Sequence, residues 1–387
     1  MSLRATAFFF ISAFFAPSLA TAEGNLHLGQ MEIHPFVSVA ETYSDNIYST
    51  PGEKKYDYIT TTTPGISLQI PFRLHKLSLD YNAVIRNYGR YTDENTTDQN
   101  ADALLDLKFG SFLGLKLNDA YSKGHEPRGS SSTGFIVRYE TNAASASATY
   151  QMADRSKIRI DYSKTVWTFD QPSDFRDRGE DLVSGYLYYR FLPKTSAFIE
   201  YDFKRVDFRN PAGDIYDNKV QSGLLGLTWE MTETTKGVLK GGYLKKDFDS
   251  PLIDDYSTWT ASLDLNFDFS QYTSLKLTGQ RTVNETNLQQ TTYFVTTGVY
   301  AEFTQQIYRR LAAVIRGSYG EDQFSNAVPP ATDPRRDITA TGGAGLKYTM
   351  RDWLEFDLDY NRSDRNSNDD GADYQSNLYT ASAKLAL

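Results

Sequence analysis

Short segments in which apolar and polar side chains alternate recur along this chain, and they restrict its fold more than any other feature. Residues 77–86 alternate in this way, and residues 103–109, 197–204 and 354–360 repeat the pattern. A β-strand places successive side chains on opposite faces, so each segment has one apolar face and one polar, partly charged face. A charged face is costly inside a soluble sandwich. It is favoured in a barrel with lipid outside and water inside.

The first 22 residues differ from the rest and predict a targeting segment. Arg4 precedes an apolar run over residues 5–15, Pro17 interrupts it, and residues 20–22 read Ala-Thr-Ala. The run is shorter than the roughly 20 residues that a membrane-spanning helix needs, and the small residues suit a signal peptidase. We therefore expect a signal peptide at residues 1–22 and a mature chain that starts at Glu23.

The mature chain, residues 23–387, is predicted to be one domain. It contains no linker, no charge block and no later run of about 18 apolar residues, so a helical membrane protein is excluded. The chain has no cysteine, so an exported protein of this sequence forgoes disulfides. A closed, hydrogen-bonded barrel is a structure that can supply the missing stability.

Two kinds of connection alternate along the mature chain. Short breaks recur about every 40 residues, which is the length of two membrane strands and a loop. Longer polar segments rich in Gly, Asn, Asp and Ser lie between them. Short turns on one side and long loops on the other are typical of outer-membrane barrels. The short breaks are predicted at residues 71–75, 110–111, 152–155, 193–194, 230–233, 268–271, 305–309 and 350–351, and long loops at 44–57, 124–134, 170–179, 321–335 and 363–372.

Aromatic residues follow the same period, each just before a short break and on the apolar face. Such rings are typical of the membrane–water interface. Two strands per short turn, with one more at each end, predict an antiparallel up-and-down barrel of about 18 strands, from residues 31–42 to residues 374–387. A soluble propeller with blades of similar length explains the period but neither the charged faces nor the aromatic placement. The predicted periplasmic girdle is Phe109, Tyr150, Phe191, Trp229, Phe267, Phe303 and Tyr348.

A barrel of 16 to 18 strands leaves an aqueous channel. Its predicted lumen carries both signs of charge, which suits a hydrated polar solute, although facing charges can also pair across the wall. Inward tyrosines could stack on sugar rings or simply fill space. No plug domain is expected between Glu23 and the first strand, and residues 124–134 are expected to be too short to occlude the pore. The lumen candidates are Arg86, Arg138, Arg159, Asp161, Tyr186, Tyr188, Arg190, Glu200, Asp202, Lys204, Arg316, Glu355 and Asp357.

No motif predicts catalysis, a cofactor or a metal, and we expect the protein not to be an enzyme. His125 near the serines at 130–132 is the only loop pair that resembles a nucleophile with its base, and an exposed loop histidine is the simpler interpretation. A calcium-type loop at residues 364–375 lacks the glycine and glutamate that such loops require. The formal net charge of −9 also argues against nucleic acid as a partner.

The opening of the mature chain resembles a known family. Residues 38–48 read Ser-Val-Ala-Glu-Thr-Tyr-Ser-Asp-Asn-Ile-Tyr, and residues 63–68 read Thr-Pro-Gly-Ile-Ser-Leu. This is similar to the putative β-barrel porin-2 family, in which an early strand ends in a Tyr-x-Asp-Asn loop and the next strand carries a Pro-Gly. The likeness of specific residues is confined to these first two strands.

The resemblance implies a barrel in the outer membrane of a Gram-negative bacterium, surrounded by outer-membrane lipid. It further implies an exit conduit for exopolysaccharide or capsule, working with a periplasmic polysaccharide-export protein. A general or solute-specific diffusion porin for small polar solutes is the alternative, as is a barrel sheath around a partner protein. A barrel enzyme or an adhesin that acts through its loops is a third class.

Overall fold

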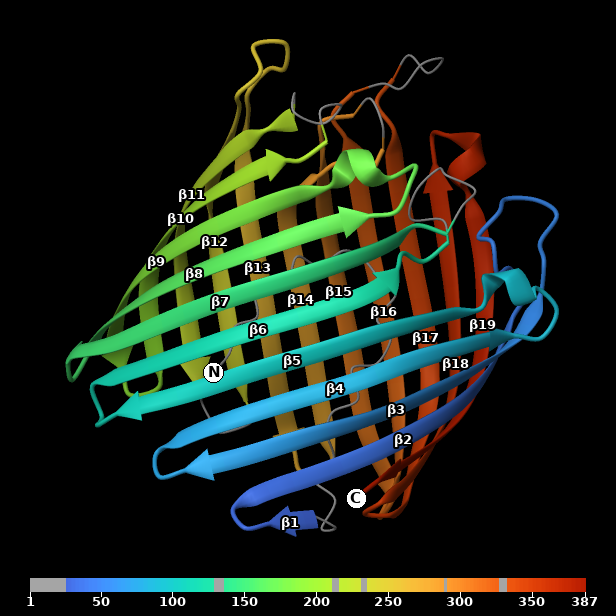
Figure 1. The fold of residues 1–387 in the computed structure, drawn as a ribbon, viewed down its shortest axis with the longest axis horizontal. Helices are drawn as coiled ribbons and strands as arrows, with labels where there is room; N and C mark the ends of the chain where they lie inside the picture. Colours follow the sequence, from blue (N-terminus) through green and yellow to red (C-terminus); the bar gives the residue numbers. More distant parts are fainter. Residues whose placement is uncertain (1–25, 129–135, 211–215, 231–234, 289–290, 327–332) are drawn as a thin grey trace.

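The chain forms one closed barrel of tilted strands (Figure 1). This computed structural model describes residues 26–128, 136–210, 216–230, 235–288, 291–326 and 333–387, so the predicted signal peptide lies outside the described residues. The wall of the barrel consists of the 18 strands β2 to β19, which confirms the predicted fold and strand number. A short strand, β1 (Leu26–Leu28), pairs with the start of β2.

Each of these strands pairs antiparallel with the strands before and after it in the sequence, and β19 pairs with β2 to close the barrel. At the closure Leu385 lies opposite Val37 and Leu378 lies opposite Ser44. Closure leaves no unpaired edge, which is the condition for strands to cross a bilayer. The strands are β2 (Met31–Ser44), β3 (Asp57–Phe72), β4 (His75–Tyr88), β5 (Thr96–Phe109), β6 (Leu113–His125), β7 (Arg138–Ala153), β8 (Ser156–Phe169), β9 (Arg178–Leu192), β10 (Thr195–Phe208), β11 (Asn218–Glu230), β12 (Lys236–Phe248), β13 (Tyr256–Ser270), β14 (Thr273–Glu285), β15 (Tyr293–Tyr308), β16 (Leu311–Phe324), β17 (Arg336–Arg351), β18 (Leu354–Ser367) and β19 (Tyr374–Ala386).

The two ends of the barrel differ as the sequence predicts. At the short-turn end most hairpins are joined by two or three residues, for example Arg73 and Leu74 between β3 and β4. Arg73 and Gly110 have positive φ there, which lets these tight turns reverse the chain. The long-loop end carries the other connections, which include the three-residue 3₁₀ helices Thr92–Glu94, Asp174–Arg176 and Asp370–Ala372. None of the helices described is long and apolar enough to cross a membrane.

Two predicted loops, residues 321–335 and 363–372, begin as strand. β16 continues to Phe324 and β18 continues to Ser367, although residues 321–323 and 363–367 are polar. The backbone ladder does not need an apolar face once the strand has left the lipid, so pairing continues into the polar region. The hydropathy pattern therefore predicted the ends of β16 and β18 a few residues before the strands actually end.

Side chains separate cleanly into an inner face and an outer face of the barrel. On β10 the inner residues Phe198 and Glu200 are 5% and 2% exposed, whereas the outer residues Ile199 and Tyr201 are 56% and 53% exposed. The inner residues are covered by neighbours that converge on the concave side. The apolar outer residues have no protein cover and require lipid.

Candidate functional site

The inner wall of β8 to β10 carries a cluster of aromatic and cationic side chains. The Arg159 guanidinium lies 3.8 Å from the centre of the Tyr186 ring, and the Lys157 ammonium lies 4.4 Å from that of Tyr188. Phe198 packs against Tyr188 at 5.1 Å between ring centres, and Tyr188 is only 6% exposed. The faces of these rings are therefore engaged by cations and by Phe198. Their geometry favours the interpretation that they fill space over that of a free sugar platform.

The charges of this region are paired within the wall. Tyr186 donates to Glu200 at 3.2 Å, and Lys240 reaches across β11 to the same carboxylate at 2.6 Å. Arg159 pairs with Asp161 at 3.0 Å, and Ser147 donates to Asp161 at 2.6 Å. Closed pairs of this kind present polar edges to the lumen with little net field.

An ion pair on the opposite wall crosses a whole strand. Arg316 on β16 donates to Asp359 on β18 at 2.9 Å, and β17 runs between them. The strand between is bare at this level because Gly343 and Gly345 occupy its inner face. A Cβ on Gly345 would lie 2.3 Å from an Asp359 carboxylate oxygen, so only glycine leaves room for the bridge.

Replacing Gly345 with valine is therefore expected to destabilise the folded barrel by about 1–3 kcal/mol, because the side chain forces Asp359 away from Arg316. Urea titration of the barrel in lipid vesicles, followed by tryptophan fluorescence, measures the change. Gly342→Val is the matched control: Gly342 lies on the same strand, and a Cβ there meets nothing within 4 Å. Equal effects of the two substitutions would show that the Arg316–Asp359 pair is not what Gly345 protects.

A second ionic cluster lies at the long-loop end of β10 to β14. The Lys246 ammonium, 1% exposed, lies 2.6 Å from a carboxylate oxygen of Glu285, and Lys204 lies 3.5 Å from the same oxygen. Asn218 donates to the other oxygen at 3.1 Å. Lys204 on β10 also pairs with Glu180 on β9 at 3.5 Å, so the cluster extends to the neighbouring strand β9.

The β14–β15 connection next to this cluster is folded against the inner wall. Leu288 is 7% exposed and packs with Phe294 and Phe324, which are inner residues of β15 and β16. Thr286 and Thr291 are 1% and 0% exposed, and their hydroxyl groups are hydrogen-bonded to each other. The loop that the sequence analysis considered for occlusion, residues 124–134, lies partly outside the described residues. The described residues of the β14–β15 connection, 286–288 and 291–292, pack on inner residues of the wall.

Charged groups also meet near His125. His125 Nδ1 lies 2.8 Å from Asp98, and Arg86 pairs with the same carboxylate. The serines at 130–132 lie outside the described residues. Within the described ranges no three His, Cys, Asp or Glu side chains are grouped to hold a metal ion.

Most of the predicted lumen residues lie on the inner face, and that they line a conducting path stays a prediction. Arg138 is an exception: it is exposed and shares the outer face of β7 with Glu140 and Tyr150. That assignment was wrong because residues 143–148 are all alanine or serine, which give no amphipathic signal to show which face is the inner one. The structure places on the inner face Arg86, Arg159, Asp161, Tyr186, Tyr188, Arg190, Glu200, Asp202, Lys204, Arg316, Glu355 and Asp357.

Sequence reasoning missed several residues of the inner clusters. Lys240 and Lys246 belong to β12, where three glycines and the adjacent lysines at 245 and 246 obscure the alternation. Glu285 ends β14 and carried no pattern at all. Asp359 was visible in the alternation of residues 354–360, but nothing in the sequence indicated its partner on β16.

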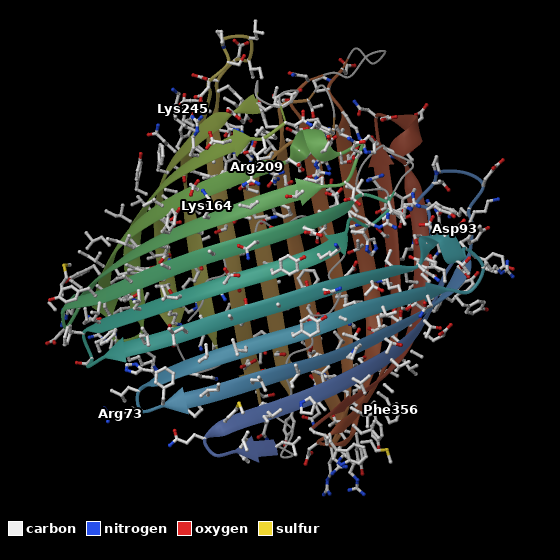
Figure 2. The ribbon with its side chains drawn as sticks, viewed as in Figure 1. Arg73, Asp93, Lys164, Arg209, Lys245 and Phe356 are labelled. Carbon is white, nitrogen blue, oxygen red and sulfur yellow. The ribbon has the colours of Figure 1, made fainter. Side chains whose placement is uncertain are left out.

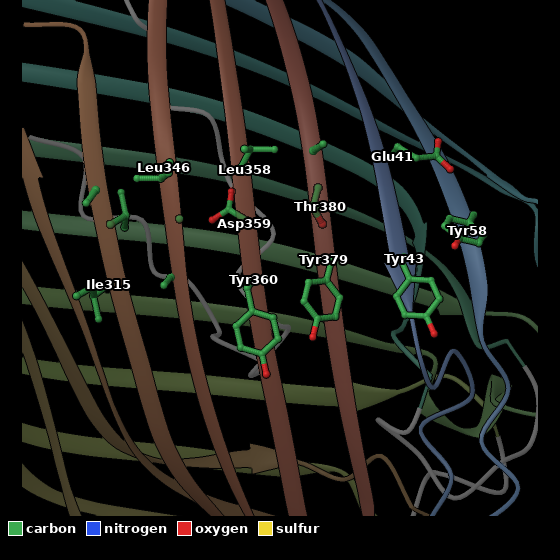
Figure 3. Close-up of a pocket in the computed structure, with 15 residues that line it drawn as sticks. Glu41, Tyr43, Tyr58, Ile315, Leu346, Leu358, Asp359, Tyr360, Tyr379 and Thr380 are labelled. Carbon is green, nitrogen blue, oxygen red and sulfur yellow. The ribbon is translucent and has the colours of Figure 1, made fainter. Parts of the chain in front are cut away.

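The predicted girdle residues lie near the short-turn end on the outer face, with Phe109 and Tyr150 44% and 49% exposed. A second row of rings, not predicted, lies toward the long-loop end: Tyr43 contacts Tyr58 at 5.2 Å between ring centres, and Tyr360 contacts Tyr379 at 5.0 Å. Figure 3 shows this row beside a groove of about 730 Å³. Most of the lining residues, among them Ile315, Leu346 and Leu358, are outer residues, so the groove lies on the lipid side of the wall.

Ion pairs continue the outer face beyond the tyrosines. Lys164 lies 2.8 Å from Asp181, and Lys245 pairs with Asp247 and lies 3.7 Å from Asp255. Figure 2 shows Lys164 and Lys245 on the long-loop side and Arg73 at the short turns. The apolar outer face is thus bounded by rings and then by charges, which is the arrangement of a membrane-spanning barrel.

The fold is shared with solved outer-membrane barrels at low sequence identity. OpdK of Pseudomonas aeruginosa, in a crystal structure with vanillate, is 10% identical with a TM-score of 0.51, over 92% of this chain and 99% of that one. OpdL of Pseudomonas aeruginosa is 11% identical with a TM-score of 0.49, over 93% and 100%. The siderophore receptor PirA of the same organism is 10% identical with a TM-score of 0.45, over 92% and 80%. No curated protein sequence matches the chain.

The family is established by sequence. Residues 22–387 match the family model described as "Putative beta-barrel porin 2", which spans the whole predicted mature chain and confirms the resemblance noted at residues 38–68. The chain therefore belongs to the putative β-barrel porin 2 family and is a porin-like outer-membrane β-barrel channel.

Proposed function

We propose that this barrel is the outer-membrane exit conduit for a secreted polysaccharide. The observation that carries the proposal is the closure of the wall charges into pairs, as in Glu200 with Lys240 and Arg316 with Asp359. Conduction requires contacts that are favourable but weak. A wall of paired charges and hydroxyl groups suits a hydrated, hydroxyl-rich chain that must slide, and no step of the transport requires chemistry by this protein.

The proposal includes a route and an orientation. The signal peptide at residues 1–22 directs export and is cleaved after Ala22. The short turns then face the periplasm and the long loops face outward, as in bacterial barrels of this type. A periplasmic polysaccharide-export protein docks on the short turns, which include residues 152–155. Replacing residues 153–155 with glycines should reduce secretion while the barrel still assembles; unchanged secretion would contradict this docking site.

Deleting the gene is expected to abolish surface polysaccharide, with uptake of small sugars unaffected and secretion restored by the intact gene. The purified barrel in planar bilayers should carry ionic current. Normal polymer secretion in the deletion strain would overturn the proposal. A barrel that inserts but carries no current would overturn any channel function.

A solute-selective porin is the second candidate, and one observation favours it. The described part of the β14–β15 connection lies on the inner wall at the long-loop end, where Leu288 packs on Phe294 and Phe324, and we expect it to narrow the lumen there. A narrow lumen suits small polar solutes more than a thick polymer. Loss of solute uptake with intact polysaccharide secretion in the deletion strain would select this function.

A further inference from the structure

The β14–β15 connection is set apart from its surroundings by how deeply it is covered. Thr286, Leu288, Thr291 and Thr292 are all at most 7% exposed. In contrast, the β12–β13 connection at the same end has Leu252 at 85% exposed. A polar connection is covered in this way only when its backbone and hydroxyl groups find partners, because unpaired polar groups are costly to bury.

Those partners are present. Thr286 Oγ1 accepts from the Leu288 amide at 3.1 Å, and Thr291 Oγ1 donates to the Leu288 carbonyl at 2.9 Å. Ser325 accepts from the Thr292 amide at 3.0 Å. The hydroxyl groups thus hold the described residues on both sides of the connection, 286–288 and 291–292, close together and attach them to the start of the β16–β17 connection.

Glu285, the last residue of β14, anchors this turn from the other side. Its carboxylate contacts Lys246 on β12, Asn218 on β11 and Lys204 on β10. Strands β10 and β14 are four steps apart around the wall, roughly 19 Å at the usual strand spacing. Extended lysine and glutamate side chains cannot span this distance, so the 3.5 Å contact between Lys204 and Glu285 requires the end of β14 to bend inward toward β10–β12. The ladder with β13 ends at Arg281, which leaves residues 282–285 able to do so.

The seat of the turn is apolar. Phe294 and Phe324 lie opposite each other on β15 and β16, with ring centres 5.2 Å apart, and Leu288 covers them. The turn is thus held by a buried carboxylate on one side and by a leucine on an aromatic pair on the other.

We propose that the described residues of the β14–β15 connection, 285–288 and 291–292, form the constriction of the channel, and that Glu285 and Leu288 fix them on the inner wall and so set the largest solute that passes. The proposal rests on the channel function proposed above. The cluster around Glu285 contains the cations Arg178, Lys204 and Lys246 and the carboxylates Glu180 and Glu285. Removing one carboxylate therefore changes both the anchoring of the turn and the charge beside the narrowest path.

Single-channel recording of Glu285→Gln in planar bilayers tests this. Conductance should rise at least about twofold, because Lys246 loses its carboxylate and the turn leaves its seat. Larger polyethylene glycols should then enter the pore. The reversal potential in a salt gradient should change in the direction that shows greater selectivity for anions. Asp364→Asn, which removes one carboxylate from an outer-face pair with Arg362, is the matched control and should leave all three unchanged.

A second measurement does not depend on conduction. The chain has no cysteine, so Leu288→Cys introduces a single thiol. Its reaction with a polar maleimide should be slow in the otherwise unchanged barrel and at least about tenfold faster when combined with Glu285→Gln, as expected from a local opening that loses roughly 1.4 kcal/mol or more. Unchanged conductance together with an unreactive thiol in Glu285→Gln would overturn the constriction. A protein without current whose thiol still becomes reactive would instead overturn the channel function and leave the anchoring role of Glu285 supported.

Discussion

A Glu126→Gln barrel is expected to be less stable than the unchanged protein by about 3–5 kcal/mol, because the substitution leaves a buried guanidinium without its carboxylate. Glu126 follows β6, and its two carboxylate oxygens accept from Arg176 in the β8–β9 connection at 2.6 and 3.1 Å. The Arg176 side chain is 1% exposed and is otherwise stacked on Phe169, 4.2 Å from the ring centre. The neutral amide keeps the shape but removes the charge that compensates the buried cation.

The same hairpin supplies the control. Glu140 on β7 pairs with Lys123 on β6 at 2.5 Å, but both side chains are about half exposed on the outer face. Exposed pairs contribute little because water screens them, so Glu140→Gln should leave the urea midpoint nearly unchanged. The two substitutions are chemically identical and differ mainly in the burial of the pair. If both shifted the midpoint equally, burial of the Arg176–Glu126 pair would not be a source of stability.

Ile160→Arg should destabilise insertion by about 2–4 kcal/mol, because it places a charge on the lipid face near the middle of the bilayer. Ile160 is an outer residue of β8 with 56% of its surface exposed. Its neighbours on that face include Tyr162, which precedes Lys164 of the outer ion pairs. Folding from urea into vesicles, measured as the fraction of folded barrel on a cold gel, gives the free energy.

Thr168→Arg is the depth control for this effect. Thr168 lies on the same strand and the same outer face, eight residues nearer the long-loop end and beyond Lys164. An arginine there stands near the interface and should cost about 0–1 kcal/mol. A cost that did not depend on position along β8 would contradict the depth assigned to the tyrosine row and to the ion pairs beyond it.

The sequence was sufficient for the barrel because lipid and water impose a simple rule on every strand. Residues 197–204 and 354–360 carry the alternation in their side chains, and each short turn is marked by its length and by a preceding ring such as Phe303. The strand number followed from the repeat of these marks. Where side chains are small, as at residues 143–148, the rule has no signal, and Arg138 was placed on the wrong face for that reason.

Which charges meet inside the barrel was decided by the tertiary structure alone. Arg316 and Asp359 are 43 residues apart in sequence, and their contact depends on the strand register and on the missing side chain of Gly345. Glu285 contacts three strands only because β14 ends where the wall curves back toward Lys204 and Lys246. Alternation is a local property of one strand, whereas these contacts depend on register and curvature, which arise only when all the strands have closed on one another.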